Sequence, residues 1–185
     1  MARTSGHPRG HTVNGLQRPV RTGGPTGENP DTILATALMG ELLFPGARMW
    51  LVSPWISDVH VVDNSHGSYD DLFGDAPPSA CSLSDLLARI VIAGSALTVV
   101  TRPDPHNAHF LARLHRRAPA QSVRVVQDAS VHEKTICGRD WLLTGSMNFT
   151  VRGLLENDEA VTYKVGGSHA GQARLELAQR WKEHQ

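Results

Sequence analysis

Helix-type and strand-type segments alternate along the chain as far as Val126, and this alternation limits the fold more than any other feature. Apolar residues at helical spacing follow an N-cap at Asp31, a capping-box pattern at Ser82 and the pair Asp104-Pro105. Three short runs predict strands, the first of them apolar and the second rich in β-branched residues: Met49–Val52, Ala96–Val100 and Val123–Val126. Strands that alternate with helices are typical of α/β proteins, so we expect a layered α-β-α sandwich with a mixed, largely parallel sheet.

The pattern changes after Val126. Two apolar-rich runs, Val131–Cys137 and Trp141–Thr144, are joined by Gly138-Arg139-Asp140 and predict a β-hairpin. A short helix over 149–155, a strand over 160–165 and a closing helix over 170–182 complete the expected order. The segment 57–80 has scattered Asp, Gly, Ser and Pro and predicts a loop.

The start of the chain differs in composition from the rest. Residues 1–30 are rich in Gly, Pro, Arg and Thr and lack an apolar period, which predicts a disordered basic tail. Such a tail could contact phosphates, or it could be a solvated leader without a partner. Its basic residues are Arg3, Arg9, Arg18 and Arg21.

Composition places the remaining residues, 31–185, in one globular domain. The chain is 40% hydrophobic and 19% charged with a formal net charge of zero, and no apolar run approaches the length that spans a bilayer. Cys81 and Cys137 are too few and too far apart for a disulfide framework or a zinc site. We therefore expect a cytoplasmic protein without a membrane partner or a metal.

The predicted hairpin contains the most specific chemistry. Side chains alternate along a strand, so His132 and Lys134 are expected on one face. Ser146 and Asn148, just after the returning strand, have the same spacing. An ammonium group, a hydroxyl and a carboxamide can hold the oxygens of a tetrahedral phosphate, and a neutral imidazole can act as a nucleophile or a proton donor.

These residues resemble the phospholipase D superfamily, whose signature is His-x-Lys, then Asp, then Gly-Ser-x-Asn. Here the pattern reads His132-Glu133-Lys134 and Gly145-Ser146-Met147-Asn148. The resemblance implies that His132 is the catalytic nucleophile, that Lys134, Ser146 and Asn148 bind the substrate phosphate, and that no cofactor takes part. In small nucleases of the superfamily a glutamate bonds the nucleophilic histidine, and Glu159 fits this role. The order of predicted helices and strands resembles the family over 31–185, whereas the motif residues lie within 131–161.

The sequence departs from the family pattern at one position. The family aspartate usually follows the lysine at the place where Arg139 stands, and Asp140 comes one residue later. We interpret Asp140 as a turn residue. Some single-motif nucleases of the superfamily lack this aspartate, so the departure does not predict an inactive protein.

Superfamily enzymes bring two such motifs together, so that one histidine attacks phosphorus while the other protonates the leaving oxygen. This chain has one motif and no internal repeat, which implies a homodimer with His132 of each subunit facing the other. Short single-motif members are mainly nucleases. The resemblance therefore implies a metal-independent endonuclease that acts on DNA, and it extends to phospholipase D-like proteins of bacterial DNA-modification and defence clusters, including those that install deazaguanine bases.

Alternatives remain for the whole chain and for single residues. The protein could cleave or transfer phospholipids, or it could be a non-catalytic nucleic-acid-binding subunit of a defence complex. Ser146 could cap the helix that follows it, and Glu159 could be a surface charge at a strand entrance. Along the helix after Asp104 we interpret the histidines as surface residues: His106, His109 and His115.

Overall fold

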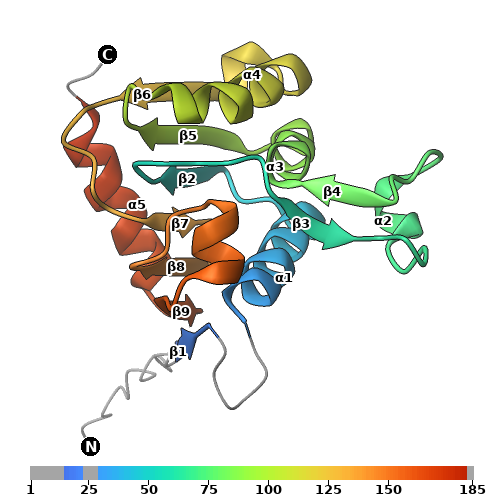
Figure 1. Ribbon diagram of the computed structural model, residues 1–185, viewed down its shortest axis with the longest axis horizontal. Coiled ribbons are helices and arrows are strands. Elements are labelled where there is room, and N and C mark those ends of the chain that lie inside the picture. Colours follow the sequence, from blue (N-terminus) through green and yellow to red (C-terminus); the bar gives the residue numbers. More distant parts are fainter. Residues whose placement is uncertain (1–14, 23–28, 183–185) are drawn as a thin grey trace, which may run out of the picture.

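The computed structural model describes residues 15–22 and 29–182 (Figure 1). Its centre is a seven-stranded sheet with the strand order β1-β9-β8-β7-β2-β5-β6. The strands are β1 (Leu16–Arg21), β2 (Arg48–Val52), β5 (Ala96–Thr101), β6 (Val123–Gln127), β7 (Thr135–Cys137), β8 (Trp141–Gly145) and β9 (Ala160–Val165). The expected α/β class and mixed sheet are confirmed, although the parallel part is small: β2, β5 and β6 run parallel, and the other pairings are antiparallel.

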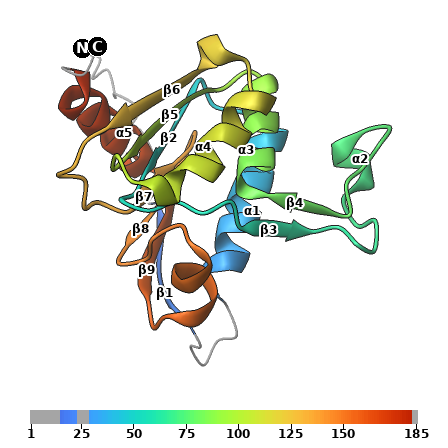
Figure 2. The same cartoon turned by 45° about the horizontal axis from the view of Figure 1, so that its top comes forward.

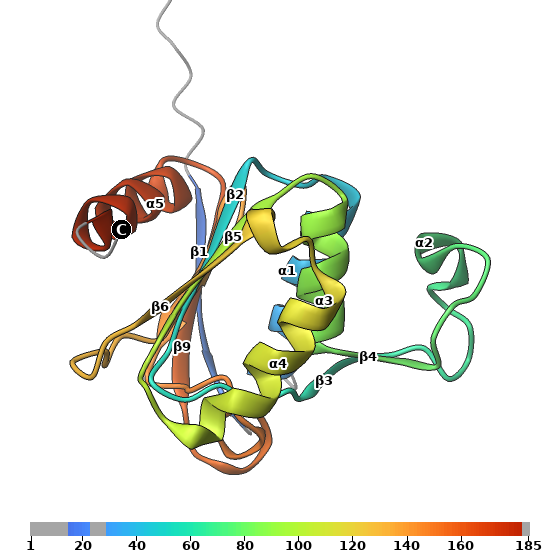
Figure 3. The same cartoon turned by 90° about the horizontal axis from the view of Figure 1, so that it is seen from above.

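Helices cover both faces of the sheet (Figure 3). On one face lie α1 (Pro30–Leu43), α3 (Leu83–Ile92) and α4 (Ala108–Arg117), and on the other lies α5 (His169–Arg180). Strand β2 explains why two layers are needed. Met49 and Leu51 join the core on the side of α1 and α3, whereas Trp50 and Val52 pack with Leu177 and Trp181 of the α5 layer. A strand with apolar residues on both faces has to be covered on both.

A two-stranded ribbon projects from the body of the molecule (Figure 2). It consists of β3 (His60–Asp63) and β4 (Ala80–Ser82), with α2 (Asp70–Phe73) near its tip. The prediction of a loop over 57–80 was therefore wrong in part. Asn64 orders the tip, because its side chain donates to Asp70 and to the Pro78 carbonyl and accepts from the Tyr69 amide. Polar contacts of this kind produce no periodic pattern of apolar residues, so the sequence did not predict the ribbon.

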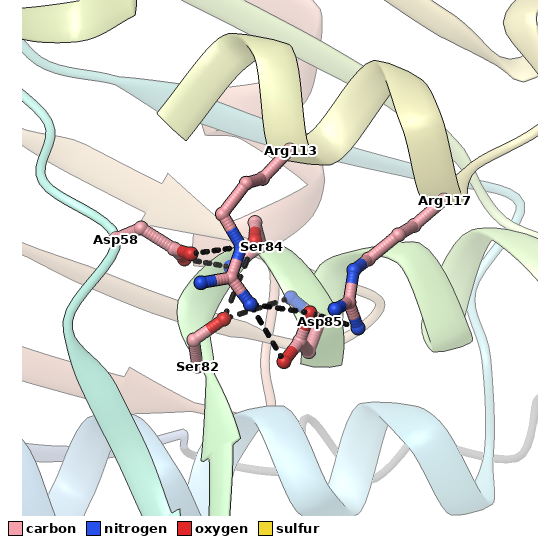
Figure 4. A network of polar contacts seen from close by, with 6 residues as sticks. All are labelled: Asp58, Ser82, Ser84, Asp85, Arg113 and Arg117. Carbon is pink, nitrogen blue, oxygen red and sulfur yellow. Dashed lines mark hydrogen bonds and ion pairs between the residues drawn. The ribbon is translucent and has the colours of Figure 1, made fainter. Parts of the chain in front are cut away.

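A polar network fixes the base of this ribbon to the helices (Figure 4). Asp58 forms a salt bridge with Arg113 of α4 at 2.9 Å, and its other oxygen accepts a hydrogen bond from the Ser84 amide. Arg113 and Arg117 also pair with Asp85 of α3. Ser82 accepts from the Asp85 amide, which confirms the predicted N-cap. The network joins α3, α4 and the chain that leaves β2.

Two predictions at the start of the chain need correction. Residues 16–21 lie in the range expected to be disordered, but they form β1 and pair with β9 at the sheet edge, where Pro19 is tolerated. Residues 1–14 lie outside the described residues. Helix α1 starts at Pro30 rather than after an Asp31 cap, with Asn29 at the N-cap position.

The strand directions bring many chain segments to one edge of the sheet. The carboxyl ends of β2, β5 and β6 lie at this edge because these strands are parallel. Since β7 is antiparallel to β2, and β8 and β9 continue that alternation, the start of β7, the end of β8 and the start of β9 lie there too. In open α/β sheets ligands bind at the carboxyl ends of the parallel strands. In the described parts of the chain no helix is long and apolar enough to cross a bilayer.

Candidate active site

His132 and Lys134 lie in an irregular segment just before β7. We expected a strand from Val131, but regular pairing begins only at Thr135. The segment is held by other contacts: the Val131 carbonyl accepts from Arg102 Nε at 2.8 Å, and the Lys134 carbonyl accepts from the Gly145 amide at 3.2 Å. These bonds replace strand pairing and fix the backbone on both sides of His132.

The His132 side chain is exposed, and its imidazole makes no hydrogen bond or ion pair with any residue in the described ranges. Glu133 turns away from it, because its carboxylate pairs with Arg180 of α5 at 3.2 Å. The Lys134 ammonium donates to the His132 carbonyl at 2.6 Å. An exposed imidazole beside a fixed ammonium group is accessible to a ligand.

The surroundings of Lys134 destabilise its charge. Partial burial lowers the pKa of its ammonium below the ordinary value of 10.5, the nearby Arg102 guanidinium lowers it further, and Glu159 acts in the opposite direction. Because carboxylates of the protein only partly neutralise the positive charge of Lys134, its ammonium group can still attract an anionic ligand.

Ser146 and Glu159 form a bonded pair at the end of β8 and the start of β9. The Ser146 hydroxyl donates to one carboxylate oxygen of Glu159, and Asn157 donates to the other at 3.3 Å. The Ala160 amide donates to the Ser146 hydroxyl at 3.1 Å. Glu159 is buried, with 9% of its surface exposed. Its side-chain hydrogen bonds in the described chain therefore lead to Ser146 and Asn157.

Asn148 lies between the buried residues Met147 and Phe149. Its amide oxygen accepts from the Ser53 hydroxyl at 3.4 Å, which links it to the end of β2. The short helix expected over 149–155 is a turn of π-helix over Arg152–Glu156. Gly153 is required there, because a Cβ at this position would lie 2.2 Å from the Asn148 carbonyl oxygen.

Sequence reasoning missed a second group of residues at this edge. Arg102 follows β5, and its guanidinium lies 5.1 Å from the centroid of the Trp55 ring, which follows β2. Asn107 is fully buried and joins both strand ends: its amide accepts from the Ile56 amide and donates to the Pro54 carbonyl, the Thr101 hydroxyl and the Arg102 carbonyl. Trp55, Arg102 and Asn107 could have been found from the sequence by their position, because each comes shortly after a predicted strand of the parallel group.

These two groups border a pocket with a volume of about 710 Å³. Asn148 and Asn157 line it, and so do Trp55 and His106. His106, which we expected to be a plain surface residue, contacts the Ser57 hydroxyl at 2.9 Å. His132 and Lys134 do not line the pocket themselves.

Asp140 lies at the opposite end of the hairpin from this site. It stands in the turn between β7 and β8, and the whole length of β8 separates it from Ser146. With a rise of about 3.4 Å per residue, that strand places the two residues more than about 10 Å apart. The buried carboxylate of Glu41 holds this turn by accepting hydrogen bonds from the Arg139 amide and the Trp141 indole. This position fits the interpretation of Asp140 as a turn residue.

Together the edge offers an exposed imidazole, an ammonium group, a hydroxyl and a carboxamide, with a guanidinium nearby. Such a set can neutralise and orient a phosphate group and present a nitrogen nucleophile to it.

Comparisons with known proteins place the fold. No family model matches the chain, and no curated protein matches its sequence. Among solved structures, the fold is similar to Nuc of Salmonella typhimurium, a phospholipase D family member, with a TM-score of 0.59 and 12% identity over 92% of this chain and 96% of that one. NucT from Helicobacter pylori gives 0.60 and 10% identity over 92% and 98%. Phosphatidylserine synthase of Haemophilus influenzae gives 0.55 and 12% identity, and the match covers 91% of this chain and 39% of that one. At these identities the likeness is one of fold.

Proposed function

We propose that this chain is a phosphodiesterase of the phospholipase D type, with His132 as the nucleophile. The main support is that the segment before β7, the end of β8 and the start of β9 lie at the same edge of the sheet. The motif residues lie on these three segments. The fold similarity to a phospholipase D family member supports the proposal as well.

In the proposed reaction an imidazole nitrogen of His132 attacks phosphorus. The new N–P bond forms as the P–O bond to the leaving group breaks, and the leaving oxygen takes a proton from a general acid. Lys134 and Asn148 donate to the non-bridging oxygens, and Ser146 joins them when its hydroxyl hydrogen turns from Glu159 to the phosphate, so that negative charge developing on these oxygens is met by donors. Water then attacks the phosphorus of the phosphohistidine and gives a proton to the group that acted as general acid, and the N–P bond breaks, which releases a phosphate monoester and frees His132. Glu159 orients Ser146 and partly offsets the effects that lower the pKa of Lys134.

The general acid is proposed to be His132 of a second subunit. The motif occurs once in the chain, so one copy supplies a nucleophile but no second histidine of the same kind. The exposed, unbonded His132 side chain is available to face a partner across a twofold axis.

For the substrate we propose DNA, cleaved as by an endonuclease, with a role in a bacterial DNA-modification or defence system that includes other subunits. The resemblance of the motif to single-motif nucleases supports this choice. The similarity in fold to a phosphatidylserine synthase keeps a phospholipid substrate as the competing activity.

The test compares wild type with His132→Ala on single- and double-stranded DNA in excess EDTA, with His109→Ala as a matched exposed histidine. We expect cleavage by wild type and His109→Ala, and a loss of at least about a thousandfold in His132→Ala. Cleavage by all three proteins would remove His132 from the chemistry. Absence of cleavage with tight DNA binding would favour the non-catalytic subunit, and turnover of phospholipid vesicles alone would favour the lipid enzyme.

A further inference from the structure

The pocket beside Asn148 has walls suited to a nucleoside. Its volume of about 710 Å³ falls in the range of small-molecule sites, and it opens beside a residue proposed to hold the scissile phosphate. Val151 is the one aliphatic side chain among the residues that line it. The other lining residues have polar groups to which a sugar and a base can hydrogen-bond.

Trp55 gives the pocket a fixed aromatic wall. Its indole nitrogen donates to Asp104 at 3.1 Å, and the Arg102 guanidinium lies over its ring. The ring is half-buried, while the other three tryptophans of the chain are buried: Trp50, Trp141 and Trp181. An aromatic ring held in place but left partly open is a surface on which a base can stack at little conformational cost.

His106 and Asp104 supply polar groups next to this ring. Asp104 accepts a hydrogen bond from the His106 amide at 2.9 Å, and the His106 ring contacts Ser57 at 2.9 Å. These bonds fix both side chains. The Asp104 carboxylate can accept hydrogen bonds from a neutral group with N–H or O–H donors, such as a base edge or a sugar hydroxyl.

We propose that this pocket binds the unpaired nucleoside joined to the scissile phosphate, with its base against Trp55. The proposal rests on the proposed function and deepens it, since it makes a single-stranded or locally unpaired nucleic acid the substrate. A base inside a duplex is stacked on both faces and paired along its edge, so it cannot reach the pocket without leaving the helix.

Tryptophan fluorescence tests the contact directly, because Trp55 is the tryptophan that a ligand can reach. His132→Ala, which is expected not to turn over its substrate, is titrated with a thymidine oligonucleotide and with a duplex of the same length. We expect saturable quenching by the single strand and none by the duplex at the same concentrations. Adding Trp55→Phe to His132→Ala should abolish the quenching. Quenching that persists without Trp55, or equal quenching by the duplex, would overturn the proposal.

A kinetic comparison separates this proposal from the proposed function. Methyl p-nitrophenyl phosphate has a phosphodiester but no nucleoside, so its cleavage depends on the phosphate site. Trp55→Ala is expected to raise KM for the oligonucleotide on the order of tenfold more than KM for the small diester, and Trp55→Phe to restore most of that difference. His109→Ala is the control, because His109 is an exposed histidine near His106 that does not line the pocket. If the small diester is cleaved and Trp55→Ala leaves the oligonucleotide KM unchanged, the pocket proposal fails while the proposed function stands. If wild type cleaves neither substrate but cleaves phosphatidylglycerol vesicles, the pocket proposal and the proposed DNA substrate both fail, whereas the proposed phosphodiesterase chemistry stands.

Discussion

The Ser146 hydroxyl donates a hydrogen bond to the carboxylate of Glu159 and accepts one from the Ala160 amide. This relationship joins the Gly-Ser-x-Asn segment to the start of β9. The family resemblance assigned Glu159 to the nucleophilic histidine, and that contact stays a prediction. In the structure Glu159 instead positions Ser146, because the Ser146 hydroxyl donates its hydrogen to the Glu159 carboxylate.

The first prediction concerns this pair. Ser146→Ala and Glu159→Gln should each lower kcat/KM, and the double variant should lose less than the sum, with a coupling of about 0.5–3 kcal/mol. The reason is that either change breaks the same hydrogen bond. Asp158→Asn is the control, because it removes a neighbouring exposed carboxylate. Additive losses would mean that the two residues act independently.

The second prediction concerns alkaline pH. Lys134 has to be protonated to hold a phosphate oxygen, so kcat/KM should fall as pH rises through its pKa, which lies below 10.5. Arg102 lowers that pKa and Glu159 raises it. Arg102→Gln should therefore move the alkaline limb of the pH profile to higher pH, and Glu159→Gln should move it to lower pH. Arginine stays charged at high pH, so any activity that Lys134→Arg retains should not fall at alkaline pH. Identical limbs in all variants would assign the titration to another group.

Much of the fold was predictable because its segments have local signals. The strand at 49–52 has an apolar run, the strands at 96–100 and 123–126 have β-branched residues, and Ser82 caps α3 as its spacing predicted. The hairpin and the pairs His132–Lys134 and Ser146–Asn148 could be found from spacing alone.

The parts that were missed depend on contacts between residues far apart in the sequence. Strand β1 has little strand propensity and forms by pairing with β9, which lies more than 130 residues later. The segment at His132 is positioned by the Arg102 side chain instead of by strand pairing. Trp55 and His106 become pocket residues because Asn107 ties the ends of β2 and β5 together. None of these contacts leaves a period in the sequence.

The third prediction follows from that role of Asn107. Asn107→Ala removes one acceptor and the donors of three hydrogen bonds in a fully buried position, and it leaves the Ile56 amide without its partner. The free energy of unfolding should fall by about 3–5 kcal/mol. Urea denaturation measures the loss, with His109→Ala as an exposed control. A loss below about 1 kcal/mol would show that solvent or neighbouring groups replace these bonds.

The fourth prediction concerns the buried thiol of Cys137. Burial raises its pKa to about 12, whereas a solvated thiol titrates near 9.0. The native protein should therefore resist thiol reagents at pH 8 and react only after unfolding. Because the folded pKa is the higher one, its contribution to stability is fully present below pH 9.0 and is lost as pH rises toward 12. Cys137→Ala should show a shallower loss of stability over this range, and parallel curves would contradict the assignment.

The last prediction tests whether two chains share one site. If each active site needs His132 from both subunits, activity depends on the fraction of dimers that have two intact histidines. An equal mixture of wild type and His132→Ala, unfolded and refolded together, should then show about one quarter of the activity of pure wild type at the same total protein concentration. Independent sites should give about one half, because every wild-type subunit would act alone. Mixing the same proteins without subunit exchange is the control and should give about one half under either arrangement. A refolded mixture that also gives one half would place the general acid within the same chain as the nucleophile.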